Sequence, residues 1–77
     1  MRFLHRHQLR AEIAKRLVKE LDLSDAEIDL LWPAIDEETR PEAVPHLDGL
    51  TAVTVDSMTD RVARTVFPGR TRRWSLL

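Results

Sequence analysis

The chain has 77 residues, of which 43% are hydrophobic and 32% are charged, and its net charge is −1. This length allows one small domain with a thin core. The absence of cysteine excludes disulfides and thiolate metal sites, and it suits a reducing compartment. Recurring charges near the N-terminus argue against a signal peptide, and no apolar run is long enough to span a bilayer. We therefore expect a soluble cytoplasmic protein without membrane association.

The charges are sorted along the sequence. Residues 1–20 hold six basic and two acidic residues, a net charge of +4. Residues 21–60 hold eleven acidic residues and one arginine, a net charge of −10, and residues 61–77 hold five arginines and no acid. Basic ends therefore flank an acidic middle. Such asymmetry bears on partners and self-association rather than on the fold.

The first predicted element is a helix from about Leu4 to Leu21. Apolar residues recur at every fourth position and form one stripe, while charged residues occupy the other faces. The stripe consists of Leu9, Ile13, Leu17 and Leu21.

A second helix is predicted to begin at Ser24. The spacing of Ser24 and Glu27 is that of a capping box, in which each side chain satisfies the other residue's backbone amide. Pro33 removes one helical hydrogen bond, so we expect a kink near Trp32. The apolar stripe continues past the proline, which favours one kinked helix with Trp32 and Ile35 in the core. The stripe comprises Ile28, Leu31, Trp32 and Ile35.

The rest of the chain is less regular. Residues 36–49 are polar and rich in proline, and they allow at most a short fourth helix. Residues 50–55 alternate as a strand would, but no second strand is available for pairing. Helical spacing of Val55, Met58 and Val62 favours a helix over about 54–67, beginning at Leu50 at the earliest. The sequence thus predicts an all-α fold, a small irregular bundle of three to four helices. Residues 1–69 would form the helical domain and 70–77 a basic C-terminal tail.

No catalytic residue, metal site, cofactor or small-molecule substrate is evident. His5 and His7 point to different sides of a helix, and His46 lies in the proline-rich segment, so three ligands do not converge. The consecutive acids at 36–38 are typical of a solvated loop rather than of an acid–base pair. We expect a protein that is not an enzyme.

Two functions remain open. The favoured one is an accessory or adaptor protein that docks on a larger protein or assembly, or associates with itself, through its arginine and aromatic residues. The residues expected to bind the partner are Phe67, Arg70, Arg72, Arg73 and Trp74. The alternative is a nucleic-acid-binding regulator that uses this tail together with Arg2, Arg6 and Arg10, which line one side of the first helix. The small, arginine-rich composition is typical of a phage or bacterial factor.

Overall fold

The computed structural model describes residues 6–40, 52–70 and 72 of the chain. These residues form three helices: α1 spans Arg6–Leu21, α2 spans Asp25–Glu38 and α3 spans Ala52–Val66. No strand occurs within this part of the chain. The all-α prediction is therefore confirmed. The segment expected to allow a fourth short helix falls largely in residues 41–51, outside the described residues.

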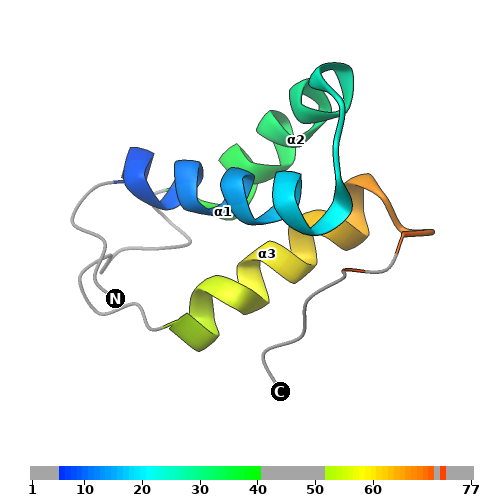
Figure 1. Cartoon of the computed structure of the whole chain (residues 1–77). Coiled ribbons are helices and arrows are strands. Elements are labelled where there is room, and N and C mark those ends of the chain that lie inside the picture. Colours follow the sequence, from blue (N-terminus) through cyan, green and yellow to red (C-terminus); the bar gives the residue numbers. More distant parts are fainter. Residues whose placement is uncertain (1–5, 41–51, 71, 73–77) are drawn as a thin grey trace.

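Each helix packs against the other two, which gives a three-helix bundle (Figure 1). The core lies where the three apolar stripes meet, and the predicted stripe of α1 is fully buried along its length. Removing these side chains from water is the main source of stability in a bundle of this size. The largest buried apolar side chains are Leu9, Ile13, Leu17, Leu31, Ile35, Val55 and Val62.

A tight turn joins α1 to α2 without a glycine. Asp22 has a φ of 55°, in the left-handed region, and the Leu23 amide donates to the Val18 carbonyl at 3.3 Å. This is the pattern of a Schellman motif, which ends a helix by satisfying one of its last carbonyls. An aspartate tolerates the conformation at some steric cost.

The capping box at the start of α2 is confirmed. The Ser24 hydroxyl accepts from the Glu27 amide at 3.3 Å, and the Glu27 carboxylate accepts from the Ser24 amide at 2.9 Å. One continuous helix runs through Pro33, as the unbroken apolar stripe indicated. Ile35 is fully buried, whereas Trp32 is half-buried and packs against the edge of the core.

Residues 52–55 are helical, which settles the choice between strand and helix in favour of helix α3. Val55, Met58 and Val62 all face the core, in agreement with their helical spacing. After Val66 the chain turns through Pro68 and Gly69, and the Arg70 amide donates to the Phe67 carbonyl at 3.0 Å. The proline and glycine therefore end the helix within one residue of the predicted boundary at residue 67.

Candidate functional site

Arg6 and Arg10, two of the residues considered for nucleic-acid binding, lie against the end of α2. Arg6 Nε donates to the Thr39 carbonyl at 2.7 Å, and Arg6 Nη2 donates to the Asp36 carbonyl at 3.1 Å. These carbonyls belong to the last turn of a helix, where no amide is available for them and where the dipole favours a cation. Arg6 thus caps the C-terminal end of α2.

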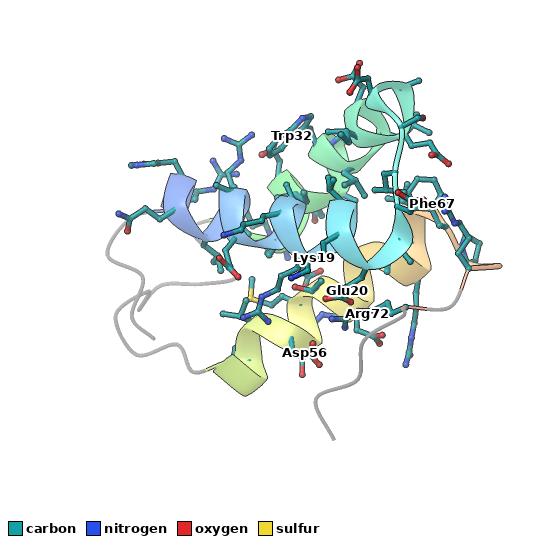
Figure 2. The ribbon with its side chains drawn as sticks, in the orientation of Figure 1. Lys19, Glu20, Trp32, Asp56, Phe67 and Arg72 are labelled. Atoms are coloured by element: carbon teal, nitrogen blue, oxygen red, sulfur yellow. The ribbon has the colours of Figure 1, made fainter. Side chains whose placement is uncertain are left out.

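Arg10 makes a second contact from α1 to the same region. Its Nε lies 2.6 Å from Asp36 Oδ1, an ionic contact without hydrogen-bond alignment, and neither atom has another hydrogen-bond partner. Its guanidinium also lies 5.2 Å from the centre of the Trp32 ring, within the range of a cation–π interaction. Figure 2 shows Trp32 on the side of the bundle opposite to Asp56. The arginine stripe of α1 therefore fastens α1 to α2.

Arg70, from the predicted partner-binding set, joins three parts of the molecule. It donates to the carbonyl of Leu21, the last residue of α1, and to Glu27 Oε2 at 2.8 Å. Its guanidinium lies 5.3 Å from the centre of the Phe67 ring, and Phe67 itself packs against the core. Arg70 therefore caps α1 in the same way that Arg6 caps α2.

Glu27 receives hydrogen bonds from two directions. The hydrogen bond from the Ser24 backbone amide has the largest effect in stabilising the charged form of Glu27. The contact with the Ser24 hydroxyl adds a smaller effect, and Arg70 adds a nearby positive charge. Together these outweigh partial desolvation and lower the pKa of Glu27 below its ordinary value of 4.5. The start of α2 is thus electrostatically tied to the segment that follows α3.

Arg72 lies in the most deeply buried charge cluster of the described residues (Figure 2). Its Nε and Nη2 donate to the two carboxylate oxygens of Glu20, the latter at 3.0 Å, and Nη2 also donates to Asp56 Oδ1 at 2.7 Å. The side chains of Arg72 and Glu20 are only 11% and 8% exposed. The hydrogen bonds with Glu20, and next those with Asp56, raise the pKa of Arg72 above its ordinary range. We call these three residues the Arg72 cluster; it joins α1, α3 and the segment beyond α3.

Every arginine in the described part of the chain is engaged in an ion pair. The remaining pairs are Arg16 with Glu12, Arg40 with Glu37, Arg61 with Glu38 and Arg64 with Asp60. Most of the arginines that were expected to contact a partner therefore form ion pairs within the molecule. Three predicted site residues, Arg2, Arg73 and Trp74, lie outside the described residues and stay predictions.

A different surface, the outward side of α2, carries groups without an internal partner. Leu30 is 59% exposed and is the largest exposed apolar side chain in the described part of the chain. Ala26 and Pro33, also exposed, lie four residues before and three residues after it, so the three form one stripe on the helix. Asp25 and Asp29 lie along one edge of the stripe, and no ion pair engages either of them within the described residues. We call these five residues the α2 face.

Pro33 gives the α2 face an additional acceptor. Proline has no amide hydrogen, so the carbonyl of Asp29, four residues earlier, lacks the donor that a helix would otherwise supply. Backbone carbonyls without a donor are costly to bury unless a partner supplies one. The α2 face therefore presents an apolar stripe, two carboxylates and an unused acceptor side by side.

Among the described residues, no group of three or more histidine, aspartate or glutamate side chains could hold a metal ion. The three helices of the described part are also too short or too polar to cross a membrane. Comparison of the chain with protein-family models, with curated proteins and with solved structures found no match.

Neither the α2 face nor the Arg72 cluster was predicted from the sequence. Glu20 carried a signal, because it lies three residues after Leu17 and seven after Ile13, on the buried stripe of α1. An acid at such a position requires a buried cationic partner. The α2 face had a weaker signal, since Leu30 is the one large aliphatic residue of α2 that lies off the predicted apolar stripe.

Proposed function

We propose that this protein is a non-enzymatic docking module that binds another protein through the α2 face. The observation that supports the proposal is the exposure of Leu30 between Ala26 and Pro33, with two unpaired acids along one edge. A single exposed leucine is common on soluble proteins, but a continuous apolar stripe edged by charge is typical of an interface. The composition supports a reducing, cytoplasmic setting and a phage or bacterial origin.

The chemistry of the α2 face favours a particular kind of partner. Burying a leucine side chain completely stabilises a complex by about 1.5–3 kcal/mol, so Leu30 can act as the anchor. Asp25 and Asp29 would orient a basic partner and repel an acidic one. The predicted partner surface is therefore apolar at its centre and carries lysine or arginine at its edge.

This proposal moves the docking site away from the arginine-rich ends. Arg72 cannot anchor a partner while its guanidinium is buried on Glu20 and Asp56, because exposing it would leave Glu20 without a counter-charge. Arg70 and Phe67 are more accessible, and they remain candidates for a secondary contact. The internal pairing of the arginines also weighs against the nucleic-acid alternative, since phosphate binding would have to compete with existing carboxylate contacts.

Affinity capture tests the proposal with three immobilised chains: wild type, Leu30→Glu and Ser57→Glu. Leu30→Glu places a charge in the middle of the stripe, while Ser57→Glu places the same charge at an exposed position of α3. We expect wild type and Ser57→Glu to retain the same proteins and Leu30→Glu to lose them. All three should have the same urea midpoint, because both substituted positions are exposed.

Two outcomes would count against a docking function at this face. Equal retention by Leu30→Glu would place any contact elsewhere on the molecule. Tight binding of duplex DNA at low salt, with a steep loss of affinity as salt rises, would favour the nucleic-acid regulator instead.

A further inference from the structure

We propose that the partner of the α2 face is a second copy of this chain, which presents the outward side of its helix α1. The inference rests on the proposed docking function and names the partner of that same surface. Exposed residues recur at every fourth position along α1 and form one stripe, here called the α1 face. Its members are His7, Ala11, Lys15 and Lys19.

The two faces carry opposite charge. The arginines of the described part form ion pairs within the molecule, so the positive charge of the α1 face comes from its lysines. Lys15 makes no ion pair in the described part of the chain, and the same holds for Asp25 and Asp29 on the α2 face. Complementary patches of this kind steer association and fix its orientation. The charges that the fold leaves unused therefore match each other between copies.

The apolar and hydrogen-bonding groups also match. Leu30 requires an apolar surface, and the α1 face offers Ala11, the aliphatic stem of Lys15 about one turn further along the helix, and the half-buried Val18 in the turn after that. The lysine ammonium has three donors and can serve a carboxylate and a carbonyl at once. The Asp29 carboxylate and the Asp29 carbonyl, which Pro33 leaves without an amide donor, provide that combination.

The two faces cannot meet within one molecule. Helices α1 and α2 pack against each other and against α3, so their outward sides point away from one another (Figure 1). A contact between them is therefore heterologous: in a pair, one copy keeps its α2 face free and the other keeps its α1 face free for further copies. A contact between single helices is small, and we expect a dissociation constant on the order of 0.1 mM. Self-association should extend beyond a dimer as concentration rises.

Sedimentation over about 10 µM to 1 mM tests this arrangement with two complementary variants. Asp29→Asn/Leu30→Gln removes the α2 face, and Lys15→Gln/Lys19→Gln removes the α1 face. We expect wild type to form species larger than a dimer and each variant alone to be monomeric, with at least tenfold weaker association. An equal mixture of the two variants should form a dimer and nothing larger, because one intact α1 face then meets one intact α2 face.

The mixing result separates this contact from other kinds of association. If α2 faces bound each other symmetrically, mixing would not restore a complex. General charge attraction does not explain restoration either, because the variants carry formal charges of about 0 and −3 and do not attract. The urea midpoint of each variant checks that it is folded, and the single substitutions Leu30→Gln and Lys15→Gln replace any double variant that is not.

A wild-type chain that stays monomeric throughout this range, or a mixture that stays monomeric, would overturn self-docking. That failure is distinct from failure of the proposed function. The capture experiment could still show a different protein that depends on Leu30, in which case the α2 face binds that protein and not a second copy. If neither self-association nor Leu30-dependent capture were observed, the α2 face would not be a docking site.

Discussion

Replacing Arg72 with alanine should destabilise the fold severely. The substitution leaves Glu20 buried with an unpaired charge and removes the hydrogen bonds that Asp56 accepts. Breaking a buried pair by removing one partner costs about 3–5 kcal/mol. Asp56 is 27% exposed and can regain water, so we expect a loss around the lower limit of this range, about 2–4 kcal/mol. A 77-residue chain has about 4–12 kcal/mol in total, so much of its stability would go.

Urea unfolding followed by tryptophan fluorescence and far-ultraviolet circular dichroism measures this loss. Arg64→Ala is the matched control, because it removes an arginine that pairs with Asp60 but is 79% exposed. Its loss should stay below about 0.5 kcal/mol, as for other exposed pairs between residues four apart. The thermal midpoint should fall by about 10–25 °C in Arg72→Ala and by only a few degrees in Arg64→Ala.

A second comparison isolates the cost of the unpaired charge. Glu20→Leu/Arg72→Met replaces the ion pair with apolar side chains, and it should recover most of the stability that Arg72→Ala loses. If Arg72→Ala and Arg64→Ala had free energies of unfolding within about 0.5 kcal/mol of each other, burial of the Arg72 cluster would not govern its energetics. The Arg72 cluster would then contribute no more to stability than an exposed ion pair.

Three further substitutions test local features. Asp22→Gly should stabilise the protein by about 1 kcal/mol in urea unfolding, because glycine adopts the left-handed conformation without steric cost; a lower stability would contradict this account of the turn. Pro33→Ala should stabilise it by about 1–3 kcal/mol, since the new amide can donate to the Asp29 carbonyl, and an unchanged midpoint would argue against an unused acceptor there. Because the pKa of Glu27 is lower in the folded state, its charge stabilises the fold above pH 4.5, and this contribution is lost as the pH falls through the folded value. The difference in urea midpoint between wild type and Glu27→Gln should therefore narrow in acid, whereas a difference independent of pH would exclude the charge as its source.

The helices could be predicted from the sequence because their determinants are local. The stripe of α1 repeats every fourth residue, and the capping box of α2 involves residues three apart. Residues 50–55 were ambiguous because β-branched side chains favour strands, and the lack of a pairing strand decided the matter. Burial against α1 and α2 then outweighs local propensity in α3.

The role of the arginines could not be predicted in the same way. A count of charges treats each as free to meet a partner, but Arg6 and Arg70 cap helix ends that are 30 to 49 residues away in sequence. Such contacts depend on how the helices cross, which no short pattern specifies. The α2 face could not be predicted for the same reason, because the exposure of Leu30 depends on which sides of α2 the other helices cover.

The Arg72 cluster also bears on when folding can finish. Glu20 and Arg72 are 52 residues apart, so a growing polypeptide places Glu20 in α1 long before its cationic partner has been synthesised. Until then, burying that side of α1 would enclose an uncompensated negative charge. Early collapse of the half-made chain is therefore unfavourable, and the contact of Arg72 with Glu20 and Asp56 permits closure of the bundle. Translation of a message truncated upstream of this codon should accordingly yield a loosely structured, protease-sensitive product.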